Sequence, residues 1–259
     1  QTMVTIDILG EFIENMDQAR ANRDEYIDLI DNIEKRDIIG NYSVKPTMFG
    51  LLLDEETCYG YIRKIVETAA GNGNFIRIDM ENSPCVDKSI SLFRRIKQEF
   101  PDHIGLVLQA YLKRTLSDID AMLDLKTQTQ DLNFRLCKGI YVEPPEIAYK
   151  DYQEINAHYL EDLEFMIKHH IYAAIATHDK PLIQGALNLI ERYDLPRDRY
   201  EFQMLYGVTP KQRKSLVRDG HRVRVYVPYG RHWFGYSTRR LKENPNMVNH
   251  IIKAMFNKG

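Results

Sequence analysis

Charged and hydrogen-bonding residues interrupt several short apolar segments of this 259-residue chain. Arg135 lies within Phe134-Arg135-Leu136, and Asp79 lies within Ile78-Asp79-Met80. A charge in a buried strand costs free energy unless it is paired or hydrogen-bonded. Comparable positions at the ends of such segments hold Lys45, Gln109, Lys138, Thr177, His178, Gln203 and Tyr226. Any one of these residues could be a structural ion pair or core hydrogen bond, but a set that converges on one rim indicates a site.

A second group of cations lies near the end of the chain. A β-branched and aromatic segment, 223–227, stops at Pro228, and a segment with helical spacing follows. That segment carries Tyr236, Arg239, Arg240 and Glu243. Guanidinium groups are always charged and can fork onto a carboxylate, although two arginines on a helix more often form a solvated face. Together with Lys45, the two arginines make three cations that could hold a carboxylate.

Eight β-rich segments alternate with segments of helical periodicity. The predicted strands are 4–9, 41–44, 75–80, 104–109, 133–137, 171–176, 200–204 and 223–227. Between them, Val86, Ile90, Phe93 and Ile96 form one apolar helical stripe, with Ser83 as the predicted N-cap before Pro84. The alternation predicts an α/β fold, a (β/α)8 TIM barrel in a single domain over 1–259. A doubly wound open sheet is the alternative, but no GxGxxG motif follows any predicted strand.

The composition argues against several classes of binding partner. The net charge is −2, which leaves no electrostatic footprint of nucleic-acid binding, and no apolar run approaches the roughly 20 residues of a membrane span. Three widely spaced cysteines contain no CxxC pair and favour a reducing, cytoplasmic compartment. Asp79 and His178 lack an obvious third ligand, so no metal is predicted.

The residue types also limit the chemistry. Arg135, Lys138 and His178 form a second cationic or hydrogen-bonding set, which suggests a larger anionic or electron-accepting group. No carboxylate pair suited to glycoside hydrolysis and no GxSxG nucleophile elbow occurs. Lys45 or Lys138 could instead form a Schiff base in an aldolase or lyase, and a non-catalytic ligand-binding barrel is a third alternative.

Taken in order, the motifs resemble those of the proline dehydrogenase family, and they cover nearly the whole chain. The matching segments are Ser43-Val44-Lys45, Ile78-Asp79-Met80-Glu81, Leu108-Gln109-Ala110-Tyr111, Arg135-Leu136-Cys137-Lys138-Gly139, Ala176-Thr177-His178, Glu201-Phe202-Gln203-Met204-Leu205-Tyr206-Gly207, Tyr226-Val227-Pro228-Tyr229-Gly230, Tyr236, Arg239-Arg240-Leu241 and Glu243-Asn244. Each motif alone is weak, whereas the ordered set is specific. The length is similar to that of the compact, single-function bacterial enzymes.

The resemblance implies a role for each matching residue. The substrate-binding set would be Lys45, Tyr226, Tyr236, Arg239 and Arg240, and Asp79 and Arg135 would be the catalytic residues. Flavin contacts would come from Met80, Gln109, Arg135, Lys138, Gly139, Ile140, Thr177, His178 and Glu243. Asp79 would orient the cationic network, and Arg135 would stabilise the reduced flavin.

The implied reaction is the oxidation of L-proline to Δ1-pyrroline-5-carboxylate by hydride transfer to N5 of FAD. The electrons would pass to a membrane quinone, which implies a cytoplasmic protein in peripheral contact with the inner face of the membrane. The family's barrel is distorted, and the last helix would cross the barrel mouth, since neighbouring arginines do not share a helix face. Cys137 and Ile140 depart from the family's smaller residues, which leaves the local flavin geometry open.

Overall fold

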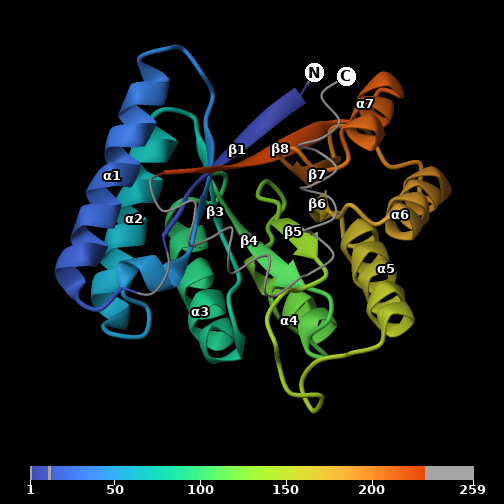
Figure 1. The fold of residues 1–259 in the computed structure, drawn as a ribbon, viewed down its shortest axis with the longest axis horizontal. Coiled ribbons are helices and arrows are strands. Elements are labelled where there is room, and N and C mark those ends of the chain that lie inside the picture. The colour runs from blue at the N-terminus through green and yellow to red at the C-terminus, as the bar shows by residue number, and fades with distance from the viewer. Residues whose placement is uncertain (1, 11–12, 231–259) are drawn as a thin grey trace.

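Parallel strands and α-helices alternate through residues 2–10 and 13–230, the part of the chain that the computed structural model describes (Figure 1). The strands are β1 (Thr2–Ile8), β2 (Asn41–Val44), β3 (Phe75–Ile78), β4 (Ile104–Gln109), β5 (Asn133–Cys137), β6 (Tyr172–Ala176), β7 (Tyr200–Leu205) and β8 (Val223–Tyr229). The helices are α1 (Met16–Glu34), α2 (Glu55–Gly71), α3 (Ser83–Glu99), α4 (Thr115–Ala121), α5 (Tyr152–Lys168), α6 (Lys180–Arg192) and α7 (Pro210–Arg218), with 3₁₀ turns η1 (Pro46–Phe49) and η2 (Leu123–Leu125).

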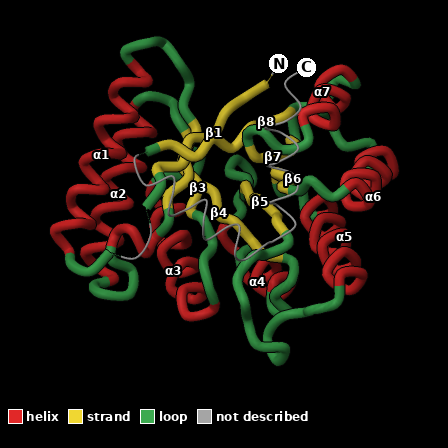
Figure 2. The backbone as a smooth tube through the Cα atoms, viewed as in Figure 1, coloured by secondary structure: helices red, strands yellow, loops and turns green. Residues whose placement is uncertain are grey.

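The strands close into a barrel in the order of the sequence, and the helices surround it (Figure 2). Closure comes from β1 and β8, which pair in parallel from Thr2 with Val223 to Ile8 with Tyr229. The predicted (β/α)8 barrel and all eight predicted strands are therefore confirmed, with shifts of one or two residues at some ends. The structure describes nothing beyond residue 230, so the predicted last helix across the barrel mouth falls outside the described residues.

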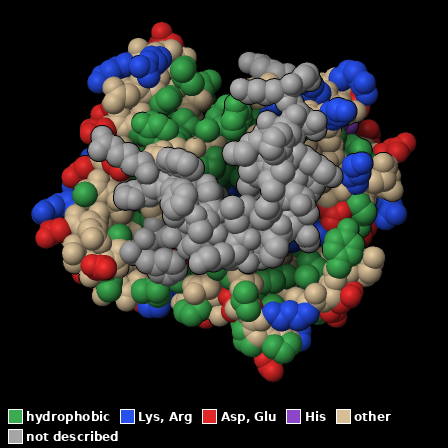
Figure 3. Space-filling view, viewed as in Figure 1, with side chains coloured by type: hydrophobic (Ala, Val, Ile, Leu, Met, Phe, Trp, Pro, Cys, Tyr) green, Lys and Arg blue, Asp and Glu red, His purple; other side chains and the backbone are tan. Residues whose placement is uncertain are grey.

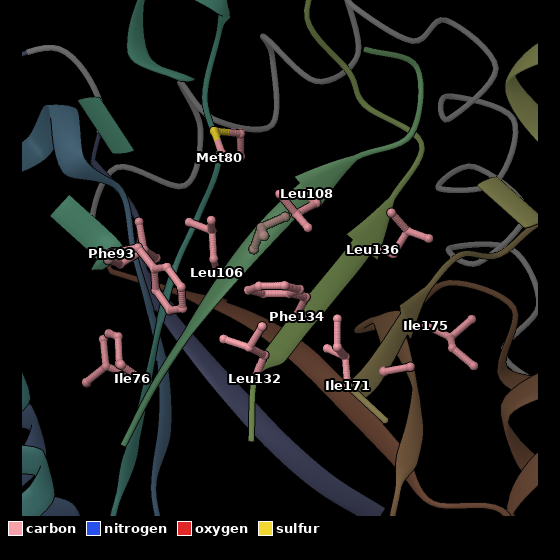
Figure 4. Packing of buried hydrophobic residues seen from close by; sticks show 14 of the residues in the cluster. Ile76, Met80, Phe93, Leu106, Leu108, Leu132, Phe134, Leu136, Ile171 and Ile175 are labelled. Carbon is pink, nitrogen blue, oxygen red and sulfur yellow. The ribbon is translucent and has the colours of Figure 1, made fainter. Parts of the chain in front are cut away.

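The strands are apolar toward the helices and polar toward the barrel axis. Phe134 and Leu136 of β5 lie in the outer layer (Figure 4), where the Phe134 ring meets that of Phe93 from α3 at 5.8 Å. Arg135 lies between them on the opposite side, because side chains alternate along a strand. Barrel interiors usually hold branched apolar side chains. Here several interior positions are charged or polar instead: Asp7, Ser43, Arg77, Arg135, Glu201, Gln203 and Arg224. All of them except Arg224 have 5% or less of their surface exposed.

Capping side chains fix several helix starts. Asn15, Asp54 and Asp151 each accept a backbone N–H from the first turn of α1, α2 and α5. The predicted N-cap of α3 is wrong by one residue. Asn82 is the N-cap, its side chain makes no capping bond, and the Ser83 N–H donates to Glu143 Oε1 at 2.7 Å. A carboxylate 60 positions away thus satisfies the first N–H of the helix.

Around the rim of the face seen in Figure 3, acidic and basic side chains are interspersed. That distribution gives this face no field of a single sign. No helix among residues 2–10 and 13–230 is long and apolar enough to span a bilayer. Within the same residues, no three His, Cys, Asp or Glu side chains are grouped as metal ligands.

Asp162 is a buried acid of α5 whose Oδ2 atom has no hydrogen-bond partner among the described residues. Burial raises the pKa of Asp162 to about 7. The folded protein therefore binds this proton more tightly than the unfolded chain, and the stability that this provides is lost as the pH rises through 7. We expect Asp162→Asn to raise the free energy of unfolding at pH 8 by about 2 kcal/mol and to have little effect below pH 4.

Urea unfolding at pH 4 and pH 8 measures this difference. Glu191→Gln is the control, because this exposed acid of α6 is not among the groups that shift the pKa of Asp162, and the substitution should change stability by less than about 0.5 kcal/mol at either pH. A destabilised Asp162→Asn protein at pH 8 would contradict the expectation.

Candidate active site

Asp79, Arg135 and Tyr226 meet at the carboxyl end of the barrel. Asp79 is the first residue after β3, not within it as predicted, and its backbone N–H donates to Val44 O at 2.9 Å. Asp79 Oδ1 accepts from Arg135 NH1 at 2.9 Å, and Asp79 Oδ2 accepts from the Tyr226 hydroxyl at 3.0 Å. The Arg135 guanidinium also lies over the Tyr226 ring, 5.2 Å from its centroid. Residues from β3, β5 and β8 thus form one network.

Further bonds hold Arg135 from other strands. Its Nε donates to Gln203 Oε1 at 2.5 Å and its NH2 donates to Ser43 Oγ at 3.1 Å. Gln203 in turn donates to Glu201 Oε1 at 2.5 Å. A guanidinium with fixed acceptors on three sides has little rotational freedom, so the position of its positive charge is set before any ligand arrives.

Glu201 and Arg224 form a buried ion pair below this network. Arg224 Nε donates to Glu201 Oε1 at 2.8 Å and Arg224 NH2 donates to Glu201 Oε2 at 3.0 Å. Burial alone would raise the pKa of Glu201, but Arg224 and Gln203 outweigh it and the pKa is lowered. A chain of hydrogen bonds therefore runs from Arg224 through Glu201 and Gln203 to Arg135.

Lys45 follows β2 and is almost fully buried, with 4% of its surface exposed. Its Nζ donates to both carboxylate oxygens of Asp7, each at 2.7 Å, and lies 4.0 Å from Asp79 Oδ2. Asp7 comes from β1, and none of its surface is exposed. The cation predicted to hold a substrate carboxylate is therefore already bound to a carboxylate of the protein.

A flanking group lies at the ends of β5 and β6. Lys138 Nζ binds Asp179 and lies 4.3 Å from the centroid of the Tyr152 ring. Burial would raise the pKa of Asp179, but its hydrogen bonds, chiefly with Lys138, outweigh this and lower it. Thr177 Oγ1 accepts the Asp179 N–H at 3.1 Å, so the turn after β6 holds the acid in place.

His178 has a defined tautomer. Its Nε2 accepts the backbone N–H of Leu205 at 2.9 Å, which places the proton of a neutral ring on Nδ1. The ring is thereby attached to β7, one strand further around the barrel. The backbone of β7 therefore contributes to the orientation of His178.

On the other side of the network, Gln109 and Met80 lie near Glu81. Gln109 Nε2 donates to the Glu81 backbone oxygen at 3.0 Å, and the Met80 side chain packs in the apolar layer (Figure 4). The Glu81 carboxylate accepts the Thr47 N–H at 2.9 Å and its hydroxyl at 2.5 Å. Burial raises the pKa of Glu81 to about 7, although Thr47 opposes the shift. These bonds attach the 3₁₀ turn after Lys45 to the end of β3.

Gly139 has no room for a side chain. Its φ is +107°, and a Cβ atom there would lie 2.1 Å from the ring of Tyr111. Ile140 follows and is 45% exposed, so its bulk is accommodated on the surface of the described residues. A bare backbone beside a half-exposed residue suits close approach of a flat ligand.

The predicted site residues thus divide into three sets. Lys45, Asp79, Arg135 and Tyr226 form one connected network, and Met80, Gln109, Lys138, Gly139, Ile140, Thr177 and His178 flank it at adjacent strand ends. Tyr236, Arg239, Arg240 and Glu243 lie outside the described residues.

The sequence reasoning missed Asp7 and Asp179, and it did not assign Glu201 or Arg224. Asp7 carries the same signal that singled out Asp79, an acid within the apolar run Val4-Thr5-Ile6-Asp7-Ile8-Leu9. Asp179 directly follows His178 and had no such signal.

A closed parallel barrel with a preorganised charged network at its carboxyl end is the architecture of a (β/α)8-barrel enzyme. The sequence profile of the proline dehydrogenase family matches residues 1–252. Proline dehydrogenase 1 of Bacillus subtilis strain 168 is 36% identical over 254 residues, which cover 98% of this chain and 82% of that protein. Proline dehydrogenase of Deinococcus radiodurans is 35% identical, over 96% of this chain and 80% of that protein. The chain therefore belongs to the proline dehydrogenase family, a family of oxidoreductases, as the motif resemblance predicted.

Comparison with solved structures supports the same barrel fold. A crystal structure of proline utilization A from Bdellovibrio bacteriovorus, inactivated by N-propargylglycine, superimposes with a TM-score of 0.86. The match covers 98% of this chain and 31% of that one at 22% identity.

Proposed function

We propose that this protein oxidises L-proline to Δ1-pyrroline-5-carboxylate with FAD as the electron acceptor. The observation that carries the proposal is the buried guanidinium of Arg135, held by Asp79, Gln203 and Ser43 at the carboxyl end of the barrel. A fixed cation suits a group that gains negative charge as it is reduced. Membership of the proline dehydrogenase family supports the same reaction.

Lys45, together with Arg239 and Arg240, would hold the substrate carboxylate. Tyr226 and Tyr236 would contact the pyrrolidine ring, and the Tyr226 ring is already fixed over Arg135. Asp79 would orient Arg135 and Tyr226, since it accepts a hydrogen bond from each. The proposed roles thus account for buried charges that packing alone does not explain.

The residues beside Arg135 fit a flavin. The Tyr111 ring occupies the place of a Cβ atom at Gly139, so the backbone is bare there, and Lys138 and Gln109 carry hydrogen-bond donors. With Arg135 they would hold FAD together with Met80, Ile140, Thr177, His178 and Glu243. FAD, when bound, would accept the hydride that leaves the ring carbon next to nitrogen. Loss of that hydride and of the amine proton gives the C=N bond of the product.

Two consequences for the cell follow from the family. The electrons would pass from the flavin to a membrane quinone, and the protein would be cytoplasmic with peripheral contact at the inner face of the membrane. L-proline and the quinone would be its partners, without nucleic acid or metal.

The Schiff-base alternative fits the geometry less well. A nucleophilic lysine must lose its proton, and Lys45 and Lys138 each contact a carboxylate, Asp7 and Asp179 respectively. An ion pair favours the charged ammonium, which cannot attack a carbonyl.

The absorption spectrum of the purified protein tests the proposal. We expect a flavin spectrum that bleaches on anaerobic addition of L-proline and that stays unchanged with D-proline. A flavin that L-proline does not bleach would reject proline as the substrate. A colourless protein that takes up no added FAD would reject the flavoenzyme, and borohydride trapping of a carbonyl compound would then support the lysine chemistry.

A further inference from the structure

Asp7 is an acid to which the proposed reaction assigns no role. Its carboxylate is fully buried on β1 and accepts a hydrogen bond from Lys45 Nζ at each oxygen. An exposed ion pair of this kind would contribute little and would be screened by salt. A buried pair is different, because removal of one partner leaves the other as an uncompensated charge. The state of Lys45 therefore depends on Asp7.

Tyr26 of α1 fixes the two strands that carry this pair. Its hydroxyl accepts the Ile8 N–H at 3.1 Å and donates to Ser43 O at 2.6 Å. Ile8 follows Asp7, and Ser43 is the register partner of Asp7 on β2. Tyr26 is itself fully buried, so β1 and β2 cannot slide without the loss of two buried hydrogen bonds. The carboxylate and the ammonium are thus held at a set separation.

Of the two acids that the described residues place beside Lys45, Asp7 is the nearer, at 2.7 Å against 4.0 Å for Asp79. The titratable groups that act on Asp7 among the described residues are Lys45 from β2, Asp79 from β3 and Tyr226 from β8, with Tyr26 adjacent on α1. Burial raises the pKa of Asp7, and Lys45 opposes that shift most strongly. Asp79 lies farther from Lys45, at 4.0 Å, and already binds Arg135 and Tyr226.

We propose that Asp7 is a positioning residue that keeps Lys45 protonated and oriented, so that a substrate carboxylate meets a fixed ammonium. The inference rests on the proposed function, since it takes Lys45 as a contact of the proline carboxylate. A buried amine without a counter-ion tends to lose its proton. Asp7 thereby acts on substrate recognition through Lys45 and does not touch the reacting atoms.

Three variants of the full FAD-loaded chain test the proposal: Asp7→Asn, Lys45→Met, and the double variant. We expect Asp7→Asn to raise the KM for L-proline about tenfold at pH 8 while kcat stays within about threefold of the wild type. The KM of Asp7→Asn should rise from pH 6.5 to pH 9 more steeply than that of the wild type, because a buried ammonium without this carboxylate gives up its proton more readily. An unchanged KM and pH profile would overturn the proposal.

The double variant separates positioning from a general loss of structure. Lys45→Met alone should raise KM by about 10- to 100-fold, and adding Asp7→Asn should cause no further loss beyond about twofold. An additional tenfold loss in the double variant would show that Asp7 acts independently of Lys45 and would overturn the proposal. This comparison does not need the Asp7→Asn single variant. If the uncompensated Asp7 carboxylate keeps Lys45→Met from folding, Lys45→Gln replaces it in both proteins, because its amide can donate to Asp7.

Binding of cyclopentanecarboxylate gives a readout that needs no turnover. This compound keeps the ring and the carboxylate of proline but lacks the amine. Its dissociation constant, measured by calorimetry, should change among the wild type and the three variants in the same order as the KM for L-proline. If the wild type binds it but does not reduce its flavin with L-proline, the proposed function fails and the coupling of Asp7 to Lys45 is still measured. Equal affinities in the wild type and in Asp7→Asn at pH 8 would overturn the inference alone.

Discussion

Replacing Arg135 with Met is expected to slow the reduction of bound flavin by L-proline by about 10²- to 10³-fold. The side chain is buried and its three hydrogen bonds fix its charge beside Asp79. Met has a similar length without the charge, so the substitution removes the proposed electrostatic stabilisation of the reduced flavin. Among the described residues it also leaves Asp79 with the Tyr226 hydroxyl and the more distant Lys45. Anaerobic stopped-flow absorption at saturating L-proline measures the rate.

Two controls accompany this variant. Arg135→Lys keeps the charge but cannot reproduce the three bonds, so its rate should be intermediate. Arg95→Met removes an exposed arginine that binds Glu56 on the surface, and its rate should stay within about twofold of the wild type. Flavin content is measured for each protein so that loss of cofactor is not counted as a slow rate. Reduction of Arg135→Met within threefold of the wild type would refute the role of its charge.

Replacing Arg224 with Met is expected to lower the free energy of unfolding by about 3–5 kcal/mol. Arg224 is the bidentate partner of Glu201, which is almost fully buried. Since the pKa of Glu201 is lowered in the folded protein, its ion pair stabilises the fold above the pKa of the unfolded chain, and this contribution is lost as the pH falls. The deficit of Arg224→Met should therefore be larger at pH 8 than at pH 3, where Glu201 approaches protonation in both states.

Denaturant unfolding at the two pH values measures the deficit. The double variant Arg224→Met with Glu201→Gln removes both charges and should recover part of the lost stability, because no buried carboxylate is then left without its cation. Since Glu201 also accepts from Gln203, which holds Arg135, the double variant should reduce flavin more slowly than the wild type even if it is stable. A single variant as stable as the wild type at pH 8 would show that water or another cation replaces Arg224.

Local pattern was sufficient to predict the strands and their order. In β5, Phe134 and Leu136 alternate with Arg135, and the structure places the apolar pair toward the helices. The eight strands close into a barrel in the order that this alternation and the family resemblance predicted. Strand ends were less predictable, because they depend on pairing. Asp79 was expected within β3 but lies one residue beyond it, where its N–H reaches Val44 of the neighbouring strand.

The alternation of residue types along the chain therefore determined the barrel, its single run of βα units and the rim on which polar residues gather. It could not determine which of these residues bind one another. Lys45 and Asp7 are 38 positions apart, and Arg135 reaches Ser43 across 92 positions. Lys45 meets Asp7 only when β1 pairs with β2, and Arg135 reaches Ser43 only when the strands close into a barrel and the interior side chains pack together. Burial then favours arrangements in which each charge has a partner within a few ångströms. The tertiary structure alone decided that Lys45 meets Asp7 and that Arg135 is linked through Gln203 to Glu201 and Arg224.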